Sequence, residues 1–400
     1  MKVLFLTLVA VNSIEDRGIY QDLLRRFRNE GHGVTIVTPI ERRAKVETNI
    51  KQSEGVTLLQ VKTFNIQKTN LVEKGIGTLA IEYQYLKAIK KHLKTMHFDL
   101  VLYSTPPITF AKVIDYVKQR DNAYSYLLLK DIFPQNAVDM KMIKKGGFLH
   151  QLFLKKEKRL YQLSDTIGCM SEANREYIIK HNSELDSNKV EVNPNSIDPI
   201  RIDNTSEEKI AIRLKYNLPI DKRILVYGGN LGKPQGLDFL LQTIEKCLFT
   251  NVYFLIVGNG TEYKKIEEWF DHHKPQNASL LKSLPKADYD ALVGACDVGL
   301  IYLHPDFSIP NFPSRLLSYL EMRKPIIAAT DMSSDIGDVL EKANCGYKVL
   351  SGDINGMIQV IDKLINNSDL EIIGANSWNL LQKEYLVGKS YTLIKEKINT

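Results

Sequence analysis

Short apolar runs of strand length alternate with amphipathic, helix-length stretches from one end of the chain to the other. In the first half the expected strands are 3–9, 34–38, 56–61, 100–104, 124–129 and 166–170. In the second half they are 224–227, 253–257, 298–302, 326–329 and 347–350. Such alternation is typical of parallel sheets built from β-α-β units, so the pattern predicts an α/β protein.

One break divides this alternation. The segment Pro194-Asn-Ser-Ile-Asp-Pro199 is rich in turn formers, and a polar stretch follows it to Lys209, as is typical of interdomain linkers. We therefore predict two Rossmann-like domains with parallel sheets that face each other across a cleft, and a ligand at the carboxyl ends of the strands. The polar segments 39–55 and 62–77 lack periodicity, which predicts surface loops.

Length and composition agree with two soluble domains. The chain has 400 residues, of which 44% are hydrophobic and 25% are charged, values near those of average globular proteins. The apolar opening segment 1–11 precedes no signal-type cleavage site and is expected to be a buried strand. The cysteines are widely spaced and form no C-x-x-C pair, which argues against a zinc site and a disulfide framework and favours a reducing cytosol. They are Cys169, Cys247, Cys296 and Cys345.

The net charge of +6 is unevenly distributed. Residues 1–200 hold 30 Lys and Arg against 22 Asp and Glu, whereas the remaining residues hold 23 against 25. The basic half lacks zinc-finger spacing, an RNP-like aromatic motif and a recognition-helix pattern, so no nucleic-acid partner is expected. An anionic membrane surface or a phosphorylated acceptor fits this excess of positive charge better.

The clearest single motif is a glycine-rich turn between a predicted strand and a predicted helix. Its sequence is Gly228-Gly-Asn-Leu-Gly-Lys-Pro-Gln-Gly236. Glycines let the backbone approach an anion closely, and the N–H groups of a turn or helix start bind phosphate. Lys233 adds a positive charge. The alternative is a tight turn whose glycines serve packing alone.

Further motifs accompany this turn in a fixed order. In the second half they are Gly229-Asn-Leu-Gly-Lys-Pro-Gln-Gly-Leu237, Leu255-Ile-Val-Gly-Asn-Gly260, Ala295-Cys-Asp-Val-Gly-Leu300, Pro313-Ser-Arg315, and Tyr319-Leu ahead of Lys324-Pro-Ile-Ile-Ala328. In the first half they are Glu30-Gly-His-Gly-Val-Thr-Ile-Val37, Ser104-Thr-Pro-Pro107, Asp131-Ile-Phe-Pro134 and Pro194-Asn-Ser-Ile-Asp198. In these motifs nearly the whole chain resembles the family 4 retaining glycosyltransferases of the two-Rossmann-domain (GT-B) type, especially the subgroup that builds bacterial surface polysaccharides.

The resemblance implies an acceptor-binding domain at 1–203, a nucleotide-sugar-binding domain at 204–378, and a helical segment at 379–400 that crosses back to the first domain. It implies transfer of a sugar from a nucleotide diphosphate, expected to be UDP, to a polyprenyl-diphosphate-linked saccharide of a surface or capsular polysaccharide. Retention at the anomeric carbon and no metal or other cofactor are expected. The alternatives are a nucleotide-sugar 2-epimerase of the same fold and a non-catalytic nucleotide-sugar-binding protein. The expected location is cytoplasmic, at the inner face of the membrane.

The family's donor-site residues carry over mainly to the second half. Contacts to the donor diphosphate or sugar are expected from Gly18, Gly229, Asn230, Gly232, Lys233, Gln235, Gly258, Pro313, Ser314, Arg315, Ser318 and Glu321. Many relatives have Arg and Lys at the positions of Asn230 and Gln235, so Lys233 and Arg315 are expected to stabilise the leaving diphosphate instead. Pro313 and Ser314 predict a helix start that would add its N-terminus to Arg315.

A glutamate pair found in many relatives is missing. The two positions hold Pro310 and Ser318 here. Glu321, one helical turn beyond Ser318, is the candidate to replace part of that role, and the alternative is a solvated helical glutamate. The only D-x-D, Asp288-Tyr-Asp290, precedes a predicted helix and is not expected to bind a metal.

On the acceptor side, Asp131 follows a buried strand and is the candidate to accept the proton of the acceptor hydroxyl. The alternative is a structural cap, and in retaining enzymes the departing phosphate can also take this proton. Ser104, Glu172 and Asn195 occupy family positions that face the cleft, although a helix-start glutamate and a turn asparagine also have structural explanations.

Segment 141–160 combines cations with apolar residues at helical spacing. Its cations are Lys141, Lys144, Lys145, Lys155, Lys156, Lys158 and Arg159, and its apolar residues include Phe148, Leu149, Leu152, Phe153 and Leu160. This pattern predicts a basic amphipathic helix on an anionic membrane surface. The alternative is an ordinary core helix with a solvated lysine face.

Overall fold

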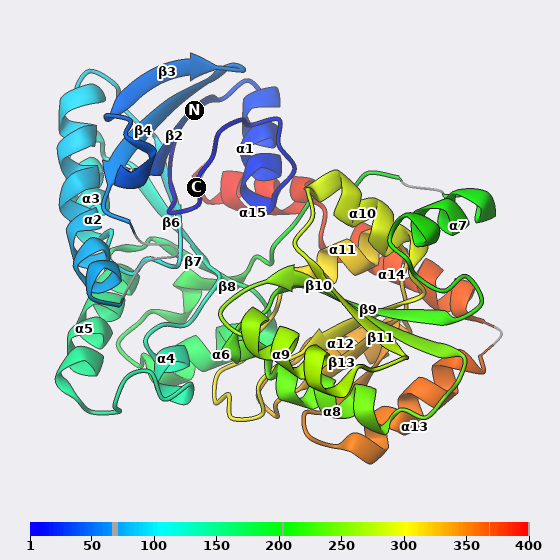
Figure 1. The fold of residues 1–400 in the computed structure, drawn as a ribbon. Coiled ribbons are helices and arrows are strands. Elements are labelled where there is room, and N and C mark those ends of the chain that lie inside the picture. The colour runs from blue at the N-terminus through cyan, green and yellow to red at the C-terminus, as the bar shows by residue number, and fades with distance from the viewer. Residues whose placement is uncertain (66–70, 202–203, 368, 399–400) are drawn as a thin grey trace. The chain divides into compact units, whose positions relative to one another are not determined.

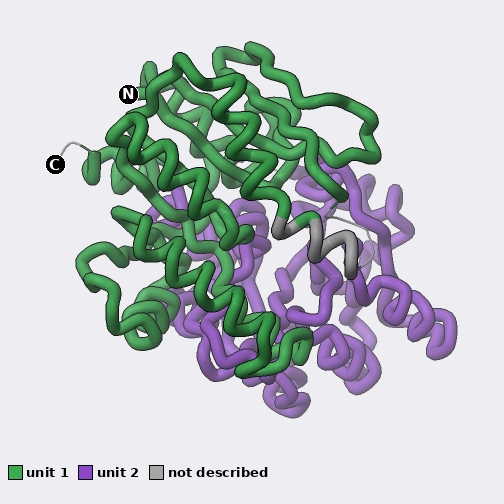
Figure 2. The backbone as a smooth tube through the Cα atoms, turned by 90° about the vertical axis from the view of Figure 1, so that its left-hand side faces the viewer, with its two compact units in different colours: residues 1–198, 387–400 green, residues 199–386 purple. Residues whose placement is uncertain are grey.

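A computed structural model describes residues 1–65, 71–201, 204–367 and 369–398, which divide into two compact units (Figure 2). Unit 1 combines Met1–Asp198 with Val387–Thr400, and unit 2 is Pro199–Leu386. The second compact unit begins at Pro199 and the chain returns to the first at Val387, whereas the resemblance implied domain bounds at 204 and 379.

Unit 1 is built on an eight-stranded sheet with the order β3-β4-β2-β1-β5-β6-β7-β8 (Figure 1). Its strands are β1 (Lys2–Leu6), β2 (Gly33–Glu41), β3 (Asn49–Ser53), β4 (Val56–Thr63), β5 (Leu100–Ser104), β6 (Tyr124–Leu129), β7 (Thr166–Cys169) and β8 (Val190–Val192). Its helices are α1 (Ile19–Asn29), α2 (Leu71–His92), α3 (Ala111–Asp121), α4 (Gln135–Asp139), α5 (Phe148–Leu163), α6 (Glu172–His181) and α15 (Val387–Ile398), with short 3-10 turns η1 (Arg42–Ala44) and η2 (Ser187–Lys189). The central strands are parallel and buried on both faces, which is why their sequences are continuous apolar runs.

The expected loop at 39–55 is wrong in part. β2 continues to Glu41, η1 follows, and β3 pairs antiparallel with β4. β3 is an edge strand with mostly exposed residues, so it shows no apolar alternation in the sequence. The expected loop at 62–77 lies partly outside the described residues, and within them β4 extends to Thr63 and α2 begins at Leu71.

The last helix of the chain, α15, packs on α1. Tyr391 lies edge-on to Phe27 with ring centroids 4.9 Å apart, and its hydroxyl is 2.9 Å from His32 Nε2. At the start of α15 the Val387 N–H donates to the carbonyl of Ile197 at 2.9 Å. These contacts make the C-terminal helix part of the core of unit 1.

Unit 2 has a fully parallel six-stranded sheet with the order β11-β10-β9-β12-β13-β14. Its strands are β9 (Arg223–Asn230), β10 (Val252–Asn259), β11 (Ala278–Lys282), β12 (Val298–Tyr302), β13 (Ile326–Thr330) and β14 (Gly346–Leu350). Its helices are α7 (Ser206–Lys215), α8 (Leu237–Lys246), α9 (Tyr263–His273), α10 (Lys286–Ala295), α11 (Arg315–Glu321), α12 (Ile336–Lys342), α13 (Ile354–Ile365) and α14 (Leu370–Glu384), with a 3-10 turn η3 (Lys233–Gln235). β11, an edge strand with one fully buried residue, is absent from the sequence-based expectation.

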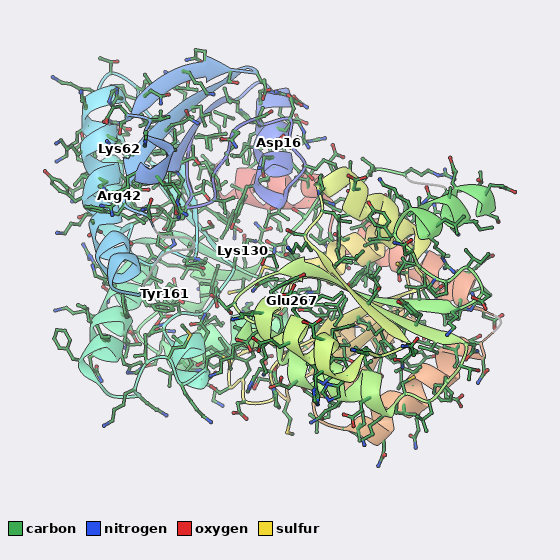
Figure 3. The ribbon with its side chains drawn as sticks, in the orientation of Figure 1. Asp16, Arg42, Lys62, Lys130, Tyr161 and Glu267 are labelled. Atoms are coloured by element: carbon green, nitrogen blue, oxygen red, sulfur yellow. The ribbon has the colours of Figure 1, made fainter. Side chains whose placement is uncertain are left out.

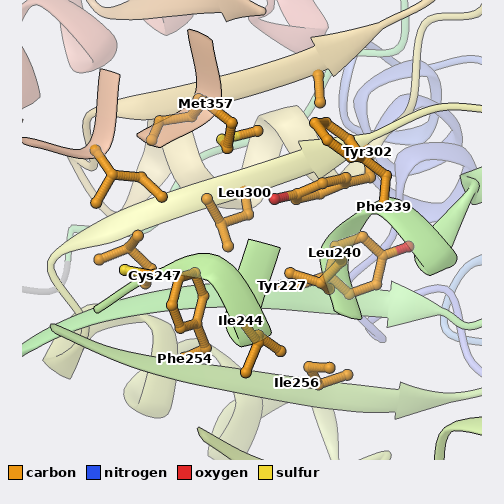
Figure 4. Packing of buried hydrophobic residues seen from close by; sticks show 14 of the residues in the cluster. Tyr227, Phe239, Leu240, Ile244, Cys247, Phe254, Ile256, Leu300, Tyr302 and Met357 are labelled. Atoms are coloured by element: carbon orange, nitrogen blue, oxygen red, sulfur yellow. The ribbon is translucent and has the colours of Figure 1, made fainter. Parts of the chain in front are cut away.

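The core of unit 2 lies between its sheet and helices α8 and α13. Figure 4 shows Tyr227, Leu300 and Tyr302 of the sheet packed against Phe239 and other residues of these helices. The strand order reverses between β9 and β12, the two central strands, and in open parallel sheets such a switch point is where ligands bind.

Candidate functional site

The two central strands of unit 2 separate at the switch point. β9 pairs with β12 only through Leu225 and Val226. Beyond this pairing the buried side chain of Tyr319 lies between the strands: its hydroxyl accepts the Gly228 N–H at 3.0 Å and lies 3.1 Å from the carbonyl oxygens of Val226 and Leu300. One hydroxyl therefore replaces strand pairing and satisfies backbone groups that would otherwise be orphaned.

Two glycines leave room for this arrangement. A Cβ on Gly299 would lie 2.5 Å from the Tyr319 ring, and a Cβ on Gly228 would lie 2.0 Å from the hydroxyl of Tyr289. Gly228 opens the turn that the sequence singled out, so its lack of a side chain is required by packing around the tyrosines as well as by access to the backbone.

Arg315 lies one helical turn before Tyr319 on α11. The guanidinium carbon is 4.2 Å from the ring centroid of Tyr227, and Tyr289 and Tyr319 also face it. Among the described residues no carboxylate forms an ion pair with Arg315, and its Nη1 is buried without a hydrogen-bond partner. Arg315 is half-buried and lacks a carboxylate partner among the described residues, so its guanidinium can pair with an anion that binds beside it.

The glycine-rich turn lies directly beside this guanidinium. Gly229 has φ +114°, and a Cβ there would be 3.9 Å from the guanidinium of Arg315. A Cβ on Gly258, near the end of β10, would lie only 1.9 Å from the carbonyl oxygen of Gly229, so the turn packs tightly on the neighbouring strand. Lys233, in η3, is exposed.

Two polar residues of this turn hold the turn itself. Gln235 Oε1 accepts hydrogen bonds from Asn230 Nδ2 at 3.2 Å and from the Gly232 N–H at 3.1 Å. The Pro234 carbonyl accepts the His304 N–H at 2.9 Å, which ties the turn to the loop after β12. Asn230 and Gln235 therefore help to fix the conformation of the turn.

The helix start expected at Pro313 and Ser314 is confirmed, but it lacks a side-chain cap. α11 has only seven residues and begins at Arg315, and the exposed Ser314 that follows Pro313 makes no side-chain capping hydrogen bond. The first backbone N–H groups of α11 therefore donate no hydrogen bond to the Ser314 side chain. Ser318 is half-buried on the same helix.

Glu321 is not the solvated helical glutamate of the alternative interpretation. It is only 3% exposed, and its Oε1 accepts the Ile200 N–H at 2.8 Å. The carboxylate thus holds the linker backbone at the start of unit 2. Asp288 and Asp290 are also used in ion pairs, with Lys215 at 2.9 Å and with Lys286 respectively.

In unit 1 the sheet order reverses between β1 and β5, where Gly18 and Ser104 follow these strands. The Gly18 carbonyl accepts the Asp22 N–H at 2.8 Å, and the Asp22 carboxylate accepts the Asp198 N–H at 2.9 Å, so the start of α1 is tied to the segment after β8. Ser104 is buried and hydrogen-bonds to the hydroxyl of Tyr20. Both residues serve the local structure, and Gly18 has an extended φ of 173°.

Asp131 is held at the carboxyl end of β6 by a side chain rather than acting as a helix cap. Asn136 Nδ2 donates to both of its carboxylate oxygens, at 2.8 and 2.7 Å, and α4 begins after Pro134 without a side-chain cap. Burial raises the pKa of Asp131 to about 6. Burial also raises the pKa of the nearby Glu157 to about 7, and the Tyr161 hydroxyl donates to Glu157 at 2.8 Å. A carboxyl group that titrates near neutral pH suits proton transfer.

Lys130, which precedes Asp131 in the chain and is labelled in Figure 3, was not predicted from the sequence. Burial lowers the pKa of its ammonium to about 7, and its Nζ lies 3.4 Å from the carbonyl of Asn193. Lys130 and Asn195 line one small cavity, and the Oδ1 atom of Asn195 is buried without a hydrogen-bond partner. A lysine that directly follows three consecutive leucines of a buried strand is the signal that could have found it. Glu172, in contrast, is mostly exposed and pairs with Arg175 of its own helix at 2.7 Å.

Comparison with known proteins agrees with this geometry. Residues 208–376 match the family described as "Glycosyl transferases group 1". The chain is 22% identical over 374 residues to the probable glycosyltransferase WbjE of Pseudomonas aeruginosa, covering 92% of this chain and 89% of that protein. It is 23% identical over 201 residues to the putative colanic acid biosynthesis glycosyl transferase WcaI of Escherichia coli K12, covering 49% and 48% of the two chains.

Solved structures share the fold over the full chain. Sucrose-phosphate synthase from Thermosynechococcus elongatus superposes with a TM-score of 0.76 at 14% identity, covering 100% of this chain and 98% of that one. Anabaena Alr3699/HepE, in complex with UDP and glucose, superposes with a TM-score of 0.73 at 14% identity, covering 100% and 99%. The fold, two Rossmann-like domains with parallel sheets, is therefore GT-B.

Replacing Tyr319 with Phe tests the role of its hydroxyl. The ring still fills its space, but the Gly228 N–H loses its buried acceptor, so we expect the free energy of unfolding of unit 2 to fall by about 1–3 kcal/mol. Urea unfolding measures this. Tyr263→Phe is the control, because that hydroxyl has no recorded hydrogen bond among the described residues and little change is expected. Equal effects of the two substitutions would contradict the role of Tyr319.

Replacing Asp131 with Asn tests the burial of its charge. Because the pKa of this carboxyl is raised from 3.8 to about 6 in the fold, ionisation disfavours the native state, and stability is lost as pH rises from about 4 to about 6. The advantage of Asp131→Asn over the parent in unfolding free energy should grow across that window, to roughly 3 kcal/mol, and stay constant above it. Urea unfolding at several pH values measures the difference, with the exposed Asp271→Asn as a control. A pH-independent difference would show that the Asp131 carboxylate is not desolvated.

Proposed function

We propose that this glycosyltransferase, whose residues 208–376 form a group 1 domain, transfers a sugar from a UDP-sugar to a lipid-linked saccharide in surface-polysaccharide biosynthesis. The observation that carries the donor half is Arg315, a half-buried cation without an ion-pair partner among the described residues, beside a glycine turn at the switch point of unit 2. The UDP complex of Anabaena HepE and the colanic acid assignment of Escherichia coli WcaI support the choice of nucleotide and of polysaccharide.

In this proposal Arg315 and Lys233 stabilise the diphosphate as it leaves. Arg315 is fixed against Tyr227, so its charge needs little reorganisation when negative charge develops, while the exposed Lys233 closes on the phosphates from the turn. These two cations supply the charge that a metal would otherwise bring, so transfer is proposed to be metal-independent. The proposed outcome at the anomeric carbon is retention.

The acceptor half is proposed to lie in unit 1. Asp131, with a pKa near 6, would be largely ionised at neutral pH and able to accept the proton of the acceptor hydroxyl, unless the departing phosphate takes it. Lys130 and Asn195 contribute a donor and an acceptor at neighbouring strand ends. Ser104 and Gly18 support this region through the hydrogen bonds of Tyr20 and Asp22.

We further propose that unit 1 meets the membrane through the start of α5, on the cytoplasmic side. Phe148 and Leu149 are 81% and 53% exposed, and Met142 is 65% exposed. Lys144, Lys145, Lys155 and Lys156 have no recorded partner among the described residues, whereas Lys158 and Arg159 pair with Glu184 and Asp115. The second half of α5 is core, as Leu160 and Tyr161 are buried, so only its first turns fit an anionic bilayer surface. No helix in the described parts of the chain has the length and apolar composition to cross a bilayer.

Substitution of the two proposed clamp residues tests the donor site. We expect Lys233→Ala and Arg315→Ala each to lower kcat/KM for the donor by roughly 10²–10³, since a fixed charge at the leaving group is lost. A thermal-shift screen against UDP-, GDP- and dTDP-sugars first identifies the donor. Release of the nucleotide then measures turnover, and product analysis in the absence of acceptor detects conversion of the donor alone. Lys342→Ala, an exposed lysine of α12, is the control. Normal turnover in both clamp variants would refute the clamp.

Vesicle sedimentation tests the membrane surface. We expect binding to vesicles containing phosphatidylglycerol, weakened by salt, and little binding to pure phosphatidylcholine. Phe148→Ser with Leu149→Ser should weaken it about tenfold or more, because two exposed apolar side chains no longer insert. Leu248→Ser, at a residue of unit 2 that is 87% exposed, should leave binding unchanged. If Leu248→Ser weakens binding as much, α5 is not the contact surface.

A further inference from the structure

A groove of about 550 Å³ lies on unit 1 between α2, strand β4 and residues Glu47 and Thr48, which precede β3. The buried residues Val61 and Ala88 contribute its apolar lining, and Tyr83, Lys87 and Lys91 of α2 contribute aromatic and charged groups. None of these residues belongs to the proposed donor site, to the Asp131 region or to the start of α5. The groove is therefore a separate feature, which we call the α2 groove.

The α2 groove carries positive charge without compensation. Lys87 and Lys91 follow each other at i and i+4 on the exposed side of α2, and neither has an ion-pair partner among the described residues. Like charges at this spacing destabilise a helix by about 0.2–0.5 kcal/mol. The only acidic residue in the lining, Glu47, is paired with Lys62. This local arrangement costs stability unless an anion binds.

Tyr83 adds an aromatic surface to this charge. It is 67% exposed, whereas Tyr85, two positions on, is fully buried with its hydroxyl donating to the Thr7 carbonyl at 2.7 Å. Beside Tyr83, Gln84 lines the groove and has an amide oxygen without a hydrogen-bond partner. An apolar ring face, an amide and spaced cations together match a ring-shaped polar ligand that bears negative charges.

We propose that the α2 groove binds an acidic saccharide chain, with Tyr83 against a sugar ring and Lys87 and Lys91 paired with the carboxylates of successive sugars. A single phosphate would leave Tyr83 and one of the two lysines unused. A bilayer would need inserting apolar side chains, and the most exposed of these in the described part of unit 1, Phe148 at 81%, lies on another helix. The site would hold part of a polymer away from its reacting end, and it does not depend on which donor the enzyme uses.

Calorimetric titration of the intact protein with a galacturonate oligosaccharide tests the proposal, with maltotetraose as the neutral probe. We expect the galacturonate to bind with a salt-dependent Kd and maltotetraose not to bind. The double variant Lys87→Glu with Lys91→Glu, and separately Tyr83→Ala, should each raise the Kd about tenfold or more. The matched control is Lys90→Glu with Lys94→Glu, which makes the same change of charge on exposed residues outside the groove lining.

Three results would overturn the proposal. If the control variant Lys90→Glu with Lys94→Glu weakens galacturonate binding equally, binding reflects overall charge alone. If maltotetraose binds as tightly as the galacturonate, the lysines have no role in binding. Binding of phosphatidylglycerol vesicles that depends on Tyr83, without binding of the galacturonate, would identify a lipid surface instead. The thermal shift produced by the UDP-sugar should be unchanged in every groove variant, so failure here and failure of the donor clamp are distinguishable.

Discussion

The hydroxyl of Tyr319 between β9 and β12 is the constraint on which the rest of unit 2 depends. It satisfies the Gly228 N–H and approaches two carbonyl oxygens where the central strands no longer pair. Because the ring occupies the space above Gly299, no side chain fits there. α11 is thereby anchored to the sheet, and Arg315, one turn earlier, is held beside the glycine turn. The position of Arg315 thus depends on the hydrogen bonds that Tyr319 makes where β9 and β12 no longer pair.

Charged side chains with low exposure in this protein fall into two groups. Arg213 and Glu321 are buried: Arg213 donates to the Ala295 carbonyl at 2.9 Å and to Asp297 at 2.8 Å, and Glu321 accepts a backbone N–H, so these charges are satisfied and hold the fold. Arg315, Lys130 and Asp131 are half-buried and have no ion-pair partner among the described residues, although Asn136 donates to both oxygens of Asp131. A desolvated charge without a counter-ion is costly, and these three residues lie near the carboxyl ends of the sheets. This contrast separates candidate functional groups from structural ones better than residue type does.

The excess positive charge of the first half is concentrated on two surfaces of unit 1. The start of α5 combines lysines with exposed aromatic and aliphatic side chains, whereas the α2 groove combines lysines with one tyrosine and an amide. The exposed apolar side chains of α5 suit a bilayer surface, whereas the tyrosine, the amide and the lysines of the α2 groove suit an acidic saccharide. Net charge alone would have assigned both to a single partner.

The sequence by itself determined what depends on local pattern: the central strands, the linker near Pro199, the glycine turn, and the two-domain class, because apolar periodicity and turn chemistry act over a few residues. The edge strands β3 and β11 could not be predicted, because strands with few buried residues lack the regular spacing of apolar residues. Only the tertiary structure decided that Glu321 binds the linker, that Gln235 shapes the turn, and that Arg315 and Lys130 are half-buried without carboxylate partners among the described residues. Those outcomes depend on which distant groups fill the space around a side chain, and no local pattern encodes that.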